Sequence, residues 1–194
     1  MNKVNDILEK IEALEKELLE ELRKTEDEVL YTIRDKKVRF SREVRRAHAV
    51  LAAKWTDYVY DSGVMMILTI PVIWAALIPV ACLDLAVSVF QVVCFPVYGI
   101  PRVRRGEYVV MDRHVLGYLN WIEKLNCSYC GYFNGVLGFV SEVAARTEQY
   151  WCPVRHARPM KSVHGRYRHF FEYGDAKGYR EGLEEVRKRF DDVK

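Results

Sequence analysis

The sequence predicts an all-α membrane protein, and three observations carry this prediction. All 11 glycines and all 6 prolines lie after residue 62, so nothing in residues 1–62 forces a helix to end. Between Val64 and Ile100 the only charged residue is Asp84, which is the composition of a membrane segment. Basic residues cluster on both sides of this segment, as they do where a chain leaves a membrane on its cytoplasmic face.

The overall composition excludes several classes of protein. The 194 residues are 50% hydrophobic and 29% charged, with a formal net charge of +3, which excludes a disordered chain, a collagen-like chain and a small disulfide scaffold. These averages alone would fit a soluble protein, so the segregation of charge along the chain is what indicates a membrane. The sequence contains no phosphate-binding glycine loop, dinucleotide fingerprint or metalloprotease motif, so it predicts no reaction.

Residues 1–62 are predicted to form one long helix or coiled coil. Apolar residues recur every eleven positions, which corresponds to about 3.67 residues per turn and a nearly straight or slightly right-handed coil. A continuous helix of this length would span about 90 Å and could not bury its apolar stripe alone. We therefore expect a homo-oligomer formed through this helix; the alternative is a helix that lies across other subunits of a membrane complex. One such row is Ile7, Leu18, Val29, Phe40 and Leu51.

The second half of this helix is basic, and we expect it to approach a lipid bilayer. The first 28 residues hold 10 acidic and 5 basic side chains, whereas residues 29–54 hold 2 acidic and 8 basic ones. A basic side chain near anionic lipid contributes about 1 kcal/mol. Nucleic acid is the competing partner for such a run, but the apolar segment begins only 18 residues after Arg46, so we expect lipid and no nucleic acid. The predicted headgroup contacts are Arg42, Arg45 and Arg46, within a run that also contains Arg34, Lys36, Lys37 and Arg39.

Residues 63–101 are predicted to form the membrane segment. A single span needs about 20 residues, and two full spans with a turn need more than the 37 residues from Val64 to Ile100. We therefore expect a short helical hairpin or re-entrant segment that turns within Ile78–Asp84. The alternative is one span, Val64–Leu83, followed by an interfacial helix. Asp84 is expected to face protein, water or headgroups, because an isolated charge in hydrocarbon is costly.

The basic residues after this segment set the predicted orientation. Arg102, Arg104 and Arg105 follow it, and we expect them to contact lipid headgroups. Because basic residues flank both ends, both termini are predicted to be cytoplasmic.

Residues 102–174 are predicted to form a helical module with a metal site. Asp112 can cap a helix to about Leu125, and an Asn134-Gly135 turn precedes a second helix to about Tyr150. The polar N-terminus is unlike a secretory signal, so the thiols are expected in a reducing compartment, where metal binding is favoured over a disulfide. A turn of the type CxxC-Gly-aromatic together with CP and a following histidine predicts a tetrahedral zinc site, with iron as the alternative metal. The predicted ligands are Cys127, Cys130, Cys152 and His156.

One geometric condition limits this metal site. If residues 134–150 form an unbroken helix, its ends are about 24 Å apart, and Cys130 and Cys152 cannot share a metal within one chain. The site would then be completed by another subunit, or there would be two sites. Free thiols or a redox dithiol are the alternative to any metal.

Polar residues are dense in the same module. Glu142 and Arg146 are four residues apart, so they are expected to pair on one face of a helix. Together with Asp112, His114 and Glu148 they form either structural ion pairs or a polar network around a cofactor. Basic and aromatic residues in 155–169 favour a membrane interface over RNA, and residues 175–194 are predicted to form a charged C-terminal helix.

The motifs of this module resemble those of a bacterial membrane protein family with no assigned activity. The resemblance covers roughly residues 65–180. It implies a location in the bacterial inner membrane and supplies no catalytic residues. It rests on Cys127-x-x-Cys-Gly-Tyr-x-Asn-Gly135 and on Ala144-Ala-Arg-Thr-Glu-Gln-Tyr-Trp-Cys-Pro-x-x-His156.

These features together predict an oligomeric, membrane-anchored scaffold or assembly protein with a structural metal site on its cytoplasmic side. One alternative is a membrane-bound metal-dependent enzyme or redox subunit that uses the cysteine and histidine side chains. The other is an accessory subunit of a larger membrane complex.

Overall fold

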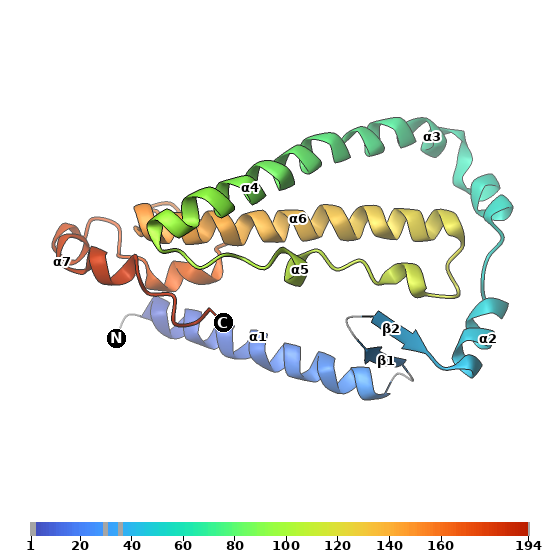
Figure 1. Cartoon of the computed structure of the whole chain (residues 1–194), viewed down its shortest axis with the longest axis horizontal. Coiled ribbons are helices and arrows are strands. Elements are labelled where there is room, and N and C mark those ends of the chain that lie inside the picture. Colours follow the sequence, from blue (N-terminus) through green and yellow to red (C-terminus); the bar gives the residue numbers. More distant parts are fainter. Residues whose placement is uncertain (1–2, 29–30, 35–36, 194) are drawn as a thin grey trace. The chain divides into compact units, whose positions relative to one another are not determined.

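The structure is a computed structural model that describes residues 3–28, 31–34 and 37–193, without the side chains of 3, 22–23, 25–34, 37–39 and 61. The described chain is predominantly helical, as predicted, and contains one short β-hairpin (Figure 1). Its elements are α1 (Lys3–Glu28), β1 (Tyr31–Arg34), β2 (Lys37–Phe40), α2 (Arg42–Val50), α3 (Trp55–Ala75), α4 (Leu77–Tyr98), α5 (Arg105–Tyr108), η1 (Arg113–Val115), α6 (Trp121–Trp151), η2 (Gly165–His169) and α7 (Ala176–Val186).

These elements form two compact units. The first unit contains the first residues of α1, most of α4, α5, the part of α6 from Val136 onward, η2 and α7. The second contains the rest of α1, the hairpin, α2, α3, η1 and the part of α6 up to Gly135. The first unit has a continuous apolar core, formed by Phe95, Ile100, Val103, Phe139, Val143 and Phe190.

The prediction of one helix over residues 1–62 is wrong. Helix α1 ends at Glu28, and β1 and β2 pair antiparallel, with Tyr31 opposite Phe40. The hairpin segment is rich in aromatic and β-branched residues, which favour strands over helices. Helix α2 then starts anew, because the Ser41 hydroxyl accepts a hydrogen bond from the Val44 amide as an N-cap.

Within α1 the apolar stripe remains exposed. Its members are 45–63% exposed and are spaced alternately by three and four residues, which is the heptad pattern of a left-handed coil rather than an eleven-residue one. Self-association through α1 stays a prediction. The predicted basic side chains at positions 34–39 lie outside the described side chains. The stripe consists of Val4, Ile7, Ile11, Leu14 and Leu18.

The apolar segment is helical from Val64 to Tyr98; Gly63, with φ of 69° and ψ of 153°, puts a kink into α3 just before it. Only Ala76 separates α3 from α4, and its φ of −64° and ψ of −18° are helical. Among the described residues, one helix, Ser62–Tyr98, is long and apolar enough to cross a membrane by length and composition. The predicted turn within Ile78–Asp84 is not formed, because these residues belong to α4. Pro79 does not break the helix, since it lies in the first turn, where a backbone N–H has no helical partner.

Helix α6 replaces the predicted pair of helices and the turn between them. The helix expected from Asp112 is absent, because η1 covers only Arg113–Val115. Instead the Asn120 side chain accepts hydrogen bonds from the amides of Ile122 and Glu123, and the Glu123 carboxylate accepts one from the Asn120 amide. This capping box starts a helix that continues to Trp151.

The glycines of α6 allow close packing rather than a turn. A Cβ atom at Gly131 would lie 3.3 Å from the Val110 carbonyl oxygen, and one at Gly138 would lie 3.3 Å from the Tyr108 ring. The segment before α6 therefore packs directly onto the helix backbone at these two positions.

Candidate functional site

Two polar side chains of α4 hold the chain that follows the helix. After Gly99, whose φ is +69°, the chain reverses direction, and the Gln91 amide binds both backbone groups of Val103, with N···O distances of 3.0 and 3.4 Å. Seven residues earlier, the Asp84 carboxylate accepts two-pronged hydrogen bonds from Arg105 at 2.7 to 3.2 Å. Seven residues are two helical turns, so both polar groups lie on one face of α4.

The two sides of α4 differ in polarity, and Asp84 lies on the side that faces protein. The residue is 8% exposed and faces protein, which is one of the three surroundings expected for it. The opposite side of α4 is apolar and exposed: Leu85, Val89, Val93 and Val97 are each more than half exposed. Helix α4 thus buries Asp84 and Gln91 together with the core residue Phe95, and its opposite side is apolar and exposed, unlike the polar outer face of a helix on a water-soluble protein.

The predicted headgroup contacts have different surroundings. Arg105 binds Asp84, and its side chain is 42% exposed. Arg102 donates to the Val92 carbonyl at 3.2 Å, and Arg104 pairs with Glu107 at 3.4 Å, but both remain exposed. The other three predicted contacts are exposed on α2: Arg42, Arg45 and Arg46.

Glu142 on α6 is the centre of a buried polar network. The predicted pair with Arg146 is formed at 2.8 Å, and the same carboxylate oxygen accepts a hydrogen bond from Arg166 at 3.1 Å. Both arginines are buried, at 6% and 4% exposed. Arg146 also donates to the Pro101 carbonyl at 2.7 Å, and Arg166 donates to the Gln149 side chain at 3.0 Å. We call Glu142, Arg146, Gln149 and Arg166 the Glu142 network.

The Glu142 network joins distant parts of the first unit. Gln149 is fully buried and donates to the carbonyls of Val186 and Arg189, at 2.9 and 2.6 Å. Burial, followed by the nearby Glu142 carboxylate, raises the pKa of Tyr108 above its ordinary value. Because protein groups already use these polar atoms, the network is suited to holding the fold together rather than to binding a substrate.

The other predicted polar residues do not join this network. Glu148 pairs with His164 at 3.0 Å. Asp112 and His114 are exposed at η1 and belong to the second unit, whereas the Glu142 network lies within the first.

The four predicted metal ligands are not brought together. Cys127 and Cys130 lie on α6, whereas Cys152 follows the end of that helix. The 22 residues from Cys130 to Trp151 are continuously helical, so the two ends of this stretch are about 32 Å apart. His156 is exposed, and its backbone amide donates to the Tyr167 hydroxyl.

One chain therefore cannot join these residues into the shared Cys3His site. Across the described residues, no three or more His, Cys, Asp or Glu side chains are grouped so that they could hold a metal ion. The zinc and iron predictions gain no support from this geometry. A CxxC sequence fits a helix as well as a metal-binding turn. Here the glycine after the second cysteine, Gly131, lets the chain at Val110 pack closely against the helix.

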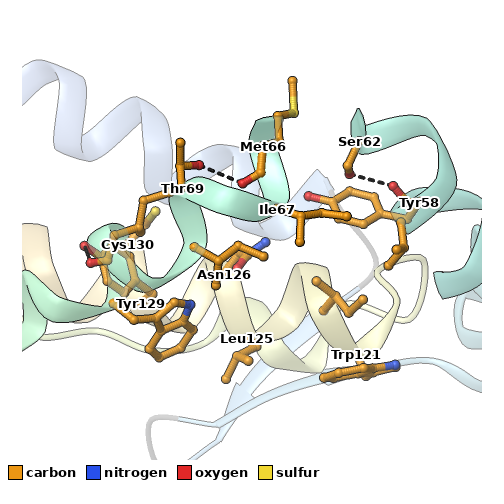
Figure 2. A pocket seen from close by; sticks show the side chains of 15 residues that line it. Tyr58, Ser62, Met66, Ile67, Thr69, Trp121, Leu125, Asn126, Tyr129 and Cys130 are labelled. Atoms are coloured by element: carbon orange, nitrogen blue, oxygen red, sulfur yellow. Dashed lines mark hydrogen bonds between the residues drawn. The ribbon is translucent and has the colours of Figure 1, made fainter. Parts of the chain in front are cut away.

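A pocket in the second unit was not predicted from the sequence. It lies between α3 and the first part of α6, and its volume is about 560 Å³ (Figure 2). The Tyr129 hydroxyl donates to the Ile73 carbonyl at 2.9 Å, and the Tyr129 ring contacts Trp74 edge-on. The signal was present in the sequence, because Trp121, Leu125 and Tyr129 are spaced by four and so share one face of a helix.

Comparison of the chain with protein-family models, with characterised proteins and with solved structures finds no match. The resemblance to a bacterial membrane protein family therefore stays a prediction.

The surroundings of His169 lead us to expect that the first unit is less stable in acid. Burial, followed by the neighbouring Arg168, lowers the pKa of His169 below its ordinary value of 6.5. Arg168 also donates to Nε2 of His169 at 3.1 Å, which requires a neutral ring. The unfolded chain takes up this proton at a higher pH than the folded chain. The stabilising contribution is therefore present above pH 6.5 and is lost as the pH falls through the lowered pKa.

We expect the melting temperature to fall more between pH 7.5 and pH 5.5 in the wild type than in His169→Gln. Thermal melts of both proteins at the two pH values measure this difference. An equal fall in the two proteins would show that another group is responsible.

Proposed function

We infer that the protein is a membrane-anchored scaffold, attached to the bacterial inner membrane by the Ser62–Tyr98 helix with both termini in the cytoplasm. The observation that carries this proposal is the exposed apolar face of α4 opposite Asp84 and Gln91. Exposed apolar surface of this extent is costly in water, and lipid would cover it. The protein-facing side of α4 already has its polar groups bound.

The geometry also supports the proposed orientation. The apolar helix has 37 residues, so its length of about 55 Å exceeds the hydrocarbon thickness of about 30 Å. Arg105 binds its middle from the side, so part of the helix is covered by polar protein. A helix that lies with one face in the membrane satisfies both facts and leaves both ends on one side. Exposed arginines near each end, on α2 and after α4, can meet anionic headgroups.

The exposed heptad stripe of α1 supports self-association of this scaffold. Its pattern is that of a coiled-coil surface, and a second copy of α1 would cover it. A partner subunit of a larger complex could cover the same stripe, which is the accessory-subunit alternative.

A membrane-release experiment tests the anchor. Wild-type protein is expected to float with lipid vesicles and to stay with them in high salt. Val89→Arg/Val93→Arg places two charges on the exposed face that lipid would cover, where a charge is costly, so flotation should fall at least tenfold. The matched control, Val89→Leu/Val93→Leu, should float like the wild type.

The opposite results would count against the anchor. A wild-type protein that is monodisperse without detergent and does not float would refute it. So would a double-arginine variant that floats as well as the leucine control.

A further inference from the structure

We propose that the pocket between α3 and α6 binds one acyl chain of an ester-linked glycerolipid, whose ester carbonyl meets Tyr58 and Asn126; this rests on the proposed membrane attachment. The pocket volume of about 560 Å³ lies within the range of specific ligand sites. All of its lining residues belong to the second unit.

The walls of the pocket suit a hydrocarbon chain. Helix α3 supplies branched and linear apolar side chains, and α6 supplies an apolar and aromatic face. Each methylene buried in such surroundings contributes about 0.8 kcal/mol, so a long chain gains more than a compact ligand of similar polarity. The apolar and aromatic lining includes Met66, Ile67, Ile70, Trp74, Trp121 and Leu125.

The position of the pocket favours a lipid from the bilayer. The α3 residues from Ser62 onward that line it belong to the apolar Ser62–Tyr98 helix. A chain that lies beside this helix in the membrane can enter the pocket without crossing water. An apolar ligand that arrives from solution would have to cross water to reach the pocket.

The polar groups of the pocket identify the chemical group at the end of the chain. Figure 2 shows the Tyr58 hydroxyl and the Asn126 amide directed into the pocket. Among the described residues, neither side chain makes a hydrogen bond. By contrast, the Ser62 hydroxyl already donates to the Tyr58 carbonyl, and that of Thr69 donates to the Met66 carbonyl. Two available donors thus face an otherwise apolar space.

The charge of the lining separates an ester from a free fatty acid. No Lys, Arg, His, Asp or Glu is among the described residues that line the pocket. A carboxylate beside Tyr58 and Asn126 would have no cation to pair with among the described lining residues. An ester carbonyl is neutral and needs only hydrogen-bond donors, which Tyr58 and Asn126 supply.

Lipid counting on the full-length protein tests this proposal. Protein purified in a mild detergent is incubated with dioleoyl phosphatidylcholine, and the lipid retained per chain is counted by native mass spectrometry. We expect one retained phospholipid per chain in the wild type. Leu125→Trp fills the pocket and should lower retention at least tenfold. Leu137→Trp, at an exposed position of the same helix outside the pocket, should retain lipid like the wild type.

A second variant keeps the test decisive if Leu125→Trp disturbs folding. Asn126→Leu keeps a similar volume but removes the donor, so retention should fall about fivefold, the effect of one net hydrogen bond. Oleic acid in place of the phospholipid should be retained at least tenfold less by the wild type. Stronger retention of oleic acid than of phospholipid would overturn the ester assignment.

Vesicle flotation separates this proposal from the anchor. Leu125→Trp should still float, because the exposed face of α4 is unchanged. A wild type that floats but retains no lipid in detergent, or equal retention by Leu125→Trp and Leu137→Trp, would overturn the pocket proposal alone. A wild type that does not float would overturn the anchor, and with it this proposal.

Discussion

Replacing Glu142 with glutamine is expected to lower the free energy of unfolding by about 3–5 kcal/mol, the usual cost of removing one partner from a buried ion pair. The change keeps the shape of the side chain and removes only its charge. Arg146 and Arg166, both nearly buried, would then lose the carboxylate at 2.8 and 3.1 Å. The Asp192 carboxylate is 3.6 Å from Arg166 and can compensate only one of them.

Thermal unfolding in mild detergent measures this effect. A loss of 1 kcal/mol lowers the melting temperature of a chain of this size by about 2–4 °C, so Glu142→Gln should lower it by roughly 6–20 °C. The matched control is Glu181→Gln on α7, because that carboxylate is 68% exposed and pairs with Lys177 only at 4.0 Å. The control should change stability by less than about 0.5 kcal/mol. If both variants melted at the same temperature, the Glu142 network would not stabilise the fold.

Local spacing predicts only part of such a network. The Glu142–Arg146 pair follows from a four-residue separation on a helix, and it is present. Gln149 follows Glu142 by seven residues on α6 and so lies on the same helix face, but Arg166 reaches the cluster only because η2 folds back onto α6. The spacing of side chains within α6 does not predict that η2 packs against this helix.

The N-terminal segment shows a different limit. The eleven-residue apolar period extends through residues 31–40, yet β1 and β2 form there. Periodicity ranks positions by polarity, while the aromatic and β-branched residues of this segment favour an extended backbone. The absence of glycine and proline permits a helix but does not require one.

The cysteine region shows why a motif needs its structural context. A pair of cysteines followed by glycine and an aromatic residue predicted a metal-binding turn, but α6 runs through it without a break. The capping box at Asn120 and Glu123 was readable in the sequence and indicates a helix start. This capping box favours one long helix, in which Cys130 and Cys152 are far apart.

The ion pair between Asp84 and Arg105 gives the second large effect, and it should be asymmetric. Arg105→Leu is expected to cost about 2–3 kcal/mol, because it leaves a nearly buried carboxylate without the guanidinium. Asp84→Asn should cost only about 1 kcal/mol, since the Arg105 side chain is 42% exposed and can keep its charge in water.

The double variant Asp84→Leu/Arg105→Leu separates the pair from its surroundings. Replacing both partners of a buried ion pair by apolar residues is often neutral or stabilising, so the double variant should be more stable than Arg105→Leu alone. The melting temperatures of the wild type, Asp84→Leu, Arg105→Leu and the double variant form a double-mutant cycle. A double variant as unstable as the sum of its singles would mean that the two side chains act independently. If the double variant is more stable than Arg105→Leu, the charge of Asp84 is tolerated in the apolar helix because Arg105 compensates for it. Arg105 comes from the chain that follows α4 and lies on the side of the helix that faces away from Val89 and Val93.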